Sequence, residues 1–250
     1  MKEHPILFKG RLVRAILDGK KTQTRRVPTP YTSQIRQTDG KLVPMPKAFY
    51  KAIQWESRDV KIRRHHFEAH GTVIVPRVQV GDLLWVKETF YCDDYRYPDG
   101  PVDAMRSGLD FQATHDCNAW EAGCPCKSES GRSEWRPSIH MPRWASRLSL
   151  RVEDVRCDRV NMISGAECIA EGVDVSDVAT TLTPEGDRRN RQWIAKGRFE
   201  QLWNEINAPR GWAFRSLRPV WIYQFRVERT VQYGADRPPR VSRVQSADDS

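Results

Sequence analysis

The 250-residue sequence has no long uninterrupted hydrophobic run. No window approaches the roughly 20 apolar residues that a membrane-spanning helix needs, and the N-terminal segment MKEHPILFKG lacks the apolar stretch of a secretory signal peptide. We therefore expect a cytoplasmic protein that does not bind membranes. In that reducing compartment, the six cysteines are expected to be thiols or metal ligands and not disulfides.

Acidic side chains are too few to balance the basic ones. The chain carries 41 lysines and arginines against 32 aspartates and glutamates, a formal net charge of +9 at pH 7. Arginine suits nucleic acids because its planar guanidinium grips phosphates and stacks on bases. The composition therefore favours RNA, DNA or a nucleotide-like ligand as the partner, and it indicates no particular protein partner.

The sequence also lacks internal repeats and the regular alternation of strands and helices that is typical of βαβ folds. Hydrophobic periodicity predicts short strands and a few helices. The strands are expected over 5–8, 22–27, 83–86, 148–152 and 221–227, and the helices over 12–17, 164–171 and 193–206. This pattern predicts an α+β fold around a small, mostly antiparallel β-barrel with flanking helices.

Local capping signals mark where two of these helices begin or end. Ser164 and Glu167 form an S-x-x-E capping box, and Gly172 follows that helix directly. Gly19 occupies the corresponding position after the first helix. A polar loop is expected to continue to about Arg189 before the last helix begins.

Changes in composition suggest how the chain is divided. Residues 1–90 and 134–230 are expected to form the two parts of one domain, with 29–70 an irregular basic loop. Residues 91–133 look like a loop-rich, cysteine-containing insertion, which a protein-interaction factor would use for its partner. Residues 231–250 are rich in proline, arginine and serine and are predicted to be a disordered tail.

Several ordered segments together resemble one known family. The segments are PILFKGRLVRAILDGKKTQTRR, VGDLLWVKETF, PSIHMPRWASRLSLRV, ISGAECIAEGVD, FEQLWNEINAPRGW and PVWIYQFRVE. They resemble the ASCH-domain proteins of the PUA-like superfamily, and most closely the larger ASCH proteins encoded by tailed phages and prophages. The resemblance covers roughly residues 5–90 and 136–227, so the insertion and the tail lie outside it.

The resemblance implies a small PUA-like β-barrel and a function directed at RNA or nucleosides. Its best-defined branch consists of small amidohydrolases that remove acyl groups from N4-acetylcytidine and related nucleosides. Another member is described as a ribonuclease, and many are presumed only to bind RNA. This chain is much longer than the small amidohydrolases.

The amidohydrolase pattern can be carried onto this chain residue by residue. A lysine and a nucleophilic threonine in a G-x-K-T-x-T segment match Lys21 and Thr24, and a glutamate from the later helix matches Glu171. Glu167, one turn earlier, is the alternative for that glutamate. The resemblance thus implies a catalytic group that needs no cofactor.

The chemistry requires an activated threonine. A threonine hydroxyl is a weak nucleophile unless a neighbour accepts its proton, and a lysine can do so only if burial or nearby cations lower its pKa. Lys20, Arg25 and Arg26 are candidate cations for that effect. In a regular strand, however, Lys21 and Thr24 would point to opposite faces, so the scheme needs a turn or bulge between them.

The competing hypothesis is an RNA-binding module without turnover. A basic stripe and several tryptophans are the groups that single-stranded RNA recognition combines. The stripe contains Arg143, Arg147, Arg151, Arg156 and Arg159, and the tryptophans are Trp135, Trp144, Trp212 and Trp221. Trp221 and Trp203 are expected in the core, whereas Trp212, in NAPRGW, is expected to be available for stacking.

Six residues are therefore candidates for contacts with substrate or RNA. They are Thr22, Arg25, Arg26, His140, Arg143 and Trp212. His140 is expected at the start of a strand, where it is either a pocket residue or a hydrogen-bonded packing residue. If the protein only binds RNA, Lys21 and Thr24 would contact a phosphate or a flipped base.

Four potential metal ligands lie within twelve residues of the insertion. They are His115, Cys117, Cys124 and Cys126, with Cys92 further upstream. Zinc favours such ligands and would support a segment with little core, although the C-x6-C-x-C spacing is not a standard zinc-binding pattern. Structural zinc and free thiols both remain open, whereas Cys157 and Cys168 are expected to be buried packing residues.

Overall fold

Two five-stranded sheets and a set of helices make up most of the structure. The computed structural model describes residues 1–52, 60–92, 109–115, 135–178 and 183–230. The first sheet has the order β1-β8-β11-β12-β2 and the second the order β4-β3-β7-β6-β5, and β9 and β10 form a separate pair. The α+β class is therefore confirmed.

The bounds of the strands follow. In the first sheet they are β1 (Glu3–Leu7), β8 (Leu83–Lys87), β11 (Leu148–Arg159), β12 (Pro219–Thr230) and β2 (Gln23–Arg26). In the second they are β4 (Leu42–Pro44), β3 (Ser33–Arg36), β7 (Thr72–Pro76), β6 (His66–Ala69) and β5 (Lys61–Arg63). The pair consists of β9 (Phe90–Cys92) and β10 (Leu109–Phe111).

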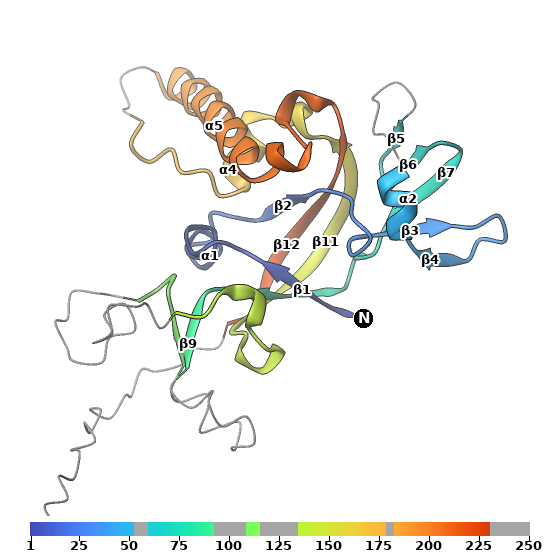
Figure 1. Ribbon diagram of the computed structural model, residues 1–250. Helices are drawn as coiled ribbons and strands as arrows, with labels where there is room; N and C mark the ends of the chain where they lie inside the picture. Colours follow the sequence, from blue (N-terminus) through green and yellow to red (C-terminus); the bar gives the residue numbers. More distant parts are fainter. Residues whose placement is uncertain (53–59, 93–108, 116–134, 179–182, 231–250) are drawn as a thin grey trace, which may run out of the picture. The chain divides into compact units, whose positions relative to one another are not determined.

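The first sheet is open among the strands that the structure describes. β1 and β2 stand at the two ends of its order, so no closed barrel is detected in these residues. β11 and β12 are long, curved neighbouring strands, and β2 pairs antiparallel along the outer side of β12 (Figure 1). β2 is consequently an edge strand, and one side of its backbone is left for contacts outside the sheet.

Contacts divide the chain into two compact units. The first contains Met1–His4, Arg14–Leu84 and Ser149–Glu228, and the described residues of the second fall mainly within Pro5–Val13 and Trp85–Leu148. The second unit has a small core of its own, in which Phe90 and Phe111 are buried with Met141. Part of the predicted insertion thus forms ordered strand pairing.

The prediction of an irregular loop over 29–70 is wrong. This segment contains β3, β4, β5, β6 and the helix α2 (Lys47–Ala52). The strands were missed because three or four residues are too few to display an alternating pattern. Buried Phe67 connects this sheet to β12, since its ring lies 5.1 Å from that of Trp221. Trp221 is in the core, as predicted.

The helices agree with the predicted order, although the last one starts earlier. Besides α2, the α-helices of the described ranges are α1 (Gly10–Leu17), α4 (Gly165–Ala170) and α5 (Pro184–Asn207). The 3-10 helices are η2 (Ser138–His140), η3 (Arg143–Ala145), η4 (Val160–Met162), η5 (Ala208–Arg210) and η6 (Phe214–Ser216). The predicted loop to Arg189 ends at Thr183, whose side chain caps α5. No helix in the described ranges is long and apolar enough to cross a membrane.

Packing between α4 and α5 is unusually close at one glycine. A Cβ at Gly165 would overlap both the Cβ and the carbonyl oxygen of Gln192. The buried face of α5 includes Ala195, Phe199 and Trp203, whereas Trp193 is 78% exposed. The tight α4–α5 contact holds α4 where its glutamates meet β2.

Candidate polar site between β2 and helix α4

Alternate residues of β2 and the segment before it face helix α4. The Gln23 amide donates to the Glu167 carbonyl oxygen (2.9 Å), and Arg25 reaches the Glu171 carboxylate. Lys21, two residues before Gln23, contacts the same glutamate. The spacing of two follows from strand geometry, in which residues i and i+2 share a face.

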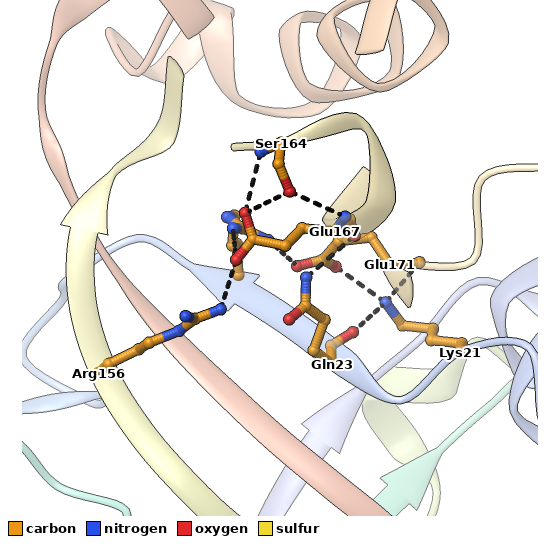
Figure 2. Close-up of polar contacts among 7 residues, drawn as sticks. Lys21, Gln23, Arg156, Ser164, Glu167 and Glu171 are labelled. Carbon is orange, nitrogen blue, oxygen red and sulfur yellow. Dashed lines mark hydrogen bonds and ion pairs between the residues drawn. The ribbon is translucent and has the colours of Figure 1, made fainter. Parts of the chain in front are cut away.

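The Lys21 ammonium is buried and donates to three acceptors. Its Nζ lies 2.7 Å from the Gln23 carbonyl oxygen, 2.6 Å from the Glu171 carbonyl oxygen and 2.9 Å from Glu171 Oε2. An ammonium has three N–H donors, so this geometry uses all of them. Figure 2 shows Lys21 between the β2 backbone and the end of α4.

The edge position of β2 explains one of these contacts. The Phe225 amide donates to the Thr22 carbonyl, which therefore points toward β12. Because carbonyls alternate in direction along an antiparallel strand, the Gln23 carbonyl points away from β12. Lys21 thus satisfies a backbone acceptor on the open edge of the sheet.

Glu171 is positioned by the end of α4. Its amide donates to the Glu167 carbonyl, and Gly172 follows with a φ of +86°, the left-handed conformation that glycine adopts without strain. A Cβ at Gly172 would lie 3.1 Å from Ala15 Cβ and 3.2 Å from Lys21 Cβ. The glycine therefore also allows the Lys21 stem to approach the helix end.

Glu171 and Arg25 form a second buried contact. Arg25 NH1 lies 3.0 Å from Glu171 Oε1, so the two carboxylate oxygens of Glu171 receive different cations. The side chains of Lys21, Arg25 and Glu171 are 1%, 2% and 7% exposed. A buried pair of this kind is retained only when its charges are well compensated, because desolvation is costly.

Glu167 extends the network toward solvent. The predicted capping box is confirmed: the backbone N–H and the Oγ of Ser164 both approach Glu167 Oε2, and Ser164 Oγ accepts from the Glu167 amide. Glu167 Oε1 lies 3.2 Å from Arg25 NH2 and also accepts from Arg156 (Figure 2). One carboxylate thus caps a helix and holds two arginines.

Burial controls the protonation behaviour of the site. Desolvation lowers the pKa of Lys21 below 10.5, and the negative charge of Glu171 only partly opposes it. Desolvation likewise lowers the pKa of Arg26, which is close enough to Glu171 to be influenced by its charge. For Glu167, burial would raise the pKa, but hydrogen bonds from Ser164 and the charges of the neighbouring arginines together bring it below its usual range.

Thr24 lies on β2 but not on the face of this network. Gln23 and Arg25 contact α4, so strand alternation directs the Thr24 side chain to the opposite face. Thr24 is buried and pairs in register with Tyr223 of β12. The Tyr223 hydroxyl is also buried and has no hydrogen-bond partner among the described residues, and burial raises its pKa. Thr22 is exposed.

The other predicted contact residues have varied positions. Trp212 is 2% exposed, which contradicts its predicted availability for stacking. It is covered because Arg218 lies over its ring, 5.3 Å from the centroid, and its carbonyl accepts from the Trp203 indole. In the second unit, His140 is exposed and ends η2 instead of starting a strand, and Arg143 lies 5.8 Å from the centroid of the Trp85 ring.

The predicted basic stripe is largely neutralised by carboxylates. Arg147 binds both oxygens of buried Glu88, each at 2.9 Å, and Arg151 lies 2.7 Å from Glu228. Arg156 belongs to the Glu167 network. These three arginines therefore do not form a continuous stripe of unpaired cations.

The predicted zinc ligands are only partly within the described ranges. His115 is described and its Nδ1 lies 2.7 Å from Asp110 Oδ2, whereas Cys117, Cys124 and Cys126 lie outside the described residues. No cluster of potential metal ligands occurs within the described ranges. Structural zinc therefore stays a prediction.

Two of the remaining cysteines in the described ranges are packing residues. Cys157 and Cys168 are buried free thiols, as predicted, and Cys92 is also buried. Burial raises the pKa of Cys168 to about 12 and raises that of Cys157 as well. A high pKa keeps these thiols protonated and unreactive near neutral pH.

The resemblance implies the two ends of the network, Lys21 and Glu171, but not the contacts that join them. The sequence gives no role to Gln23 and places Arg156 in a basic stripe. The spacing of 21, 23 and 25 was the available signal, because these positions share a strand face. What this face would meet was not visible in the sequence.

Comparisons with protein-family models, with curated proteins and with solved structures each gave no match.

Proposed function

We propose that this chain is a nucleoside- or RNA-directed protein of the ASCH type, with a PUA-like fold, that removes the acyl group from N4-acylated cytidine. The observation that carries the proposal is the buried contact between Lys21 Nζ and the Glu171 carboxylate at 2.9 Å. These residues are 150 positions apart, and both match the catalytic pattern of the amidohydrolase branch.

In the proposed reaction, the Thr24 oxygen attacks the acyl carbonyl and Lys21, as a neutral amine, accepts the hydroxyl proton. The bond between the carbonyl carbon and N4 then breaks, and the departing nitrogen takes the proton from Lys21 to become the cytidine amine. Water, deprotonated by Glu171, hydrolyses the acyl-threonine ester and regenerates the hydroxyl. A lysine pKa lowered by burial favours the neutral amine that this scheme requires.

The position of Thr24 makes the identity of the nucleophile the main question. Lys21 donates to the Gln23 carbonyl, which belongs to the peptide joined to Thr24, but strand alternation directs the Thr24 hydroxyl to the other face. For the threonine route, the end of β2 must therefore rearrange when substrate binds. If it does not, Lys21 and Glu171 would act on a water molecule that attacks the acyl carbonyl directly.

The test is release of cytidine from N4-acetylcytidine, followed by chromatography. We expect Lys21→Met and Glu171→Gln each to lower kcat by about 100-fold or more, the usual contribution of an acid–base group. Thr24→Ala should abolish release and Thr24→Ser should retain part of it. Thr72→Ala, a change of the same size in β7, is the matched control and should keep the wild-type rate.

Two outcomes would change the proposal. Full activity of Thr24→Ala together with an inactive Lys21→Met would replace the threonine nucleophile by water. No release by the wild type from acetyl, propionyl or longer N4-acyl cytidines would contradict the amidohydrolase proposal.

RNA binding without turnover is the second candidate function. It is favoured by the excess of cations around Glu167 and Glu171 and by the net charge of +9. On this hypothesis, the same polar site holds a phosphate or a base edge and carries out no chemistry.

A further inference from the structure

The polar site contains more positive than negative groups. Lys21, Arg25 and Arg156 contact its two glutamates. These three cations and two carboxylates leave a formal excess of one positive charge. Charges in a buried environment interact strongly because the local dielectric constant is low, so this excess favours an anion.

Two of these cations carry donors that the described residues do not use. The Nε of Arg25 and the Nε of Arg156 are both buried and have no hydrogen-bond partner among the described residues. The Arg25 side chain as a whole is only 2% exposed. Buried donors of a charged group are costly when unsatisfied, and an oxyanion would satisfy them.

Glu167 prepares these arginines for a ligand. Ser164 holds one carboxylate oxygen from the backbone and the side chain, and the other oxygen contacts both Arg25 and Arg156. The two guanidinium groups are therefore fixed in place before any ligand arrives. A fixed donor pair loses less conformational entropy on binding than two free arginines would.

The side chains of the network differ in their exposure to solvent. The Arg156 side chain is 32% exposed, whereas those of Lys21 and Arg25 are almost completely buried. A ligand that enters from solvent therefore meets Arg156 first. Planar guanidinium groups bind phosphate oxygens through paired donors, which a lysine ammonium does not.

We propose that Arg25 and Arg156, held by Glu167, bind a phosphate group of the substrate. The preferred substrate is then a nucleotide or a segment of RNA, not a free nucleoside. This inference rests on the proposed nucleoside-directed function and specifies the substrate class for the same site. Arg156 is the residue that determines this specificity.

Binding is measured on the full chain by isothermal titration calorimetry at pH 7 and low salt. The ligands are cytidine, cytidine 5′-monophosphate and a short oligocytidylate. We expect the monophosphate to bind at least tenfold more tightly than cytidine, and Arg156→Gln to remove this difference. Arg156→Lys keeps the charge without the paired donors and should restore only part of it.

Arg226→Gln is the matched control, because it removes the same charge from an exposed position on β12. It should retain the preference for the monophosphate, and thermal unfolding of each variant verifies folding. Tighter binding of the oligonucleotide than of the monophosphate would identify RNA as the source of the phosphate, and equal binding would identify a mononucleotide.

The inference is overturned if cytidine and its monophosphate bind equally, if neither binds, or if Arg226→Gln and Arg156→Gln lose the same affinity. The test of the phosphate site is independent of the test of deacylation. An Arg156-dependent preference for the monophosphate without any deacylation would support the phosphate site and contradict the amidohydrolase proposal. Deacylation of the free nucleoside without such a preference would support the amidohydrolase proposal and contradict the phosphate site.

Discussion

The protonation of a single buried lysine connects the stability of this protein to its proposed chemistry. Lys21 gives all three donors to nearby oxygens, yet burial lowers its pKa despite the adjacent Glu171 carboxylate. The folded state therefore releases the Lys21 proton more readily than the unfolded chain does. Stability and the proportion of neutral amine should consequently change over the same pH range, which lies below 10.5.

This coupling predicts a rise in the free energy of unfolding with pH. Between the lowered folded-state pKa of Lys21 and 10.5, the unfolded chain binds more protons, so the free energy of unfolding should increase by at most about 1.4 kcal/mol per pH unit. Above 10.5 this contribution should become constant. Urea unfolding at a series of alkaline pH values measures the slope.

Lys21→Met is the appropriate comparison, because Glu171 keeps its contact with Arg25 in that variant. The variant lacks the titrating amine and should show a smaller rise over the same interval. Parallel curves for the wild type and Lys21→Met would contradict the direction of the pKa shift.

Among the secondary-structure elements, the contact between α4 and α5 determines where the glutamates of α4 lie. Gly165 faces the backbone of α5 at Gln192, so the helices approach more closely than any side chain at position 165 would allow. A Cβ at Gly197, which lies on α5, would meet no atom of the described residues within 4 Å. Position 165 therefore has no room for a side chain, whereas position 197 does.

We expect alanine substitutions at these two glycines to change the free energy of unfolding in opposite directions. Gly165→Ala should lower the free energy of unfolding by about 1–3 kcal/mol, because the backbone of α5 must move to avoid the new methyl group. Gly197→Ala should raise it by up to about 1 kcal/mol, because alanine favours an exposed helix interior. Chemical denaturation measures both, and a neutral Gly165→Ala would show that the helices are not so closely packed.

At the scale of the whole molecule, the net charge of +9 is relevant to the proposed association with RNA. Many arginines are engaged with carboxylates, as Arg147 is with Glu88, so the charge available to a polyanion is smaller than the sequence suggests. Counterion release nevertheless makes any phosphate-based binding depend strongly on salt.

We expect oligocytidylate affinity to fall as the salt concentration rises, with a linear relation between the logarithms of the two quantities. Fluorescence anisotropy between about 50 and 200 mM salt measures the slope, and a binding mode with several phosphate contacts loses orders of magnitude in affinity over that range. Arg156→Gln should reduce the slope by about one, the loss of one phosphate contact. Affinity that is independent of salt would contradict the RNA-binding hypothesis.

Features that depend on neighbours in sequence were predictable. The Ser164–Glu167 capping box and the glycine after α4 involve groups a few residues apart, and the structure has both. The helix before Gly19 and the strand that contains Arg25 were likewise visible as short patterns. Their contacts are local, so the residue types were sufficient to identify them.

Features that depend on distant partners were not predictable from the residues. The short strands of 29–70 are stabilised by neighbouring strands and not by their own alternation, and Trp212 is buried because other segments cover it. Resemblance identified Lys21 and Glu171, but their contact exists because the chain between them folds back over 150 positions.

The sequence by itself therefore determined the α+β class, the capped helix α4 and the cationic residues of β2, because each follows from residue type and spacing. Only the tertiary structure decided that Lys21, Gln23 and Arg25 face α4 while Thr24 faces away. The physical reason is that strand alternation assigns residues to two faces, but the packing of distant elements decides what each face contacts.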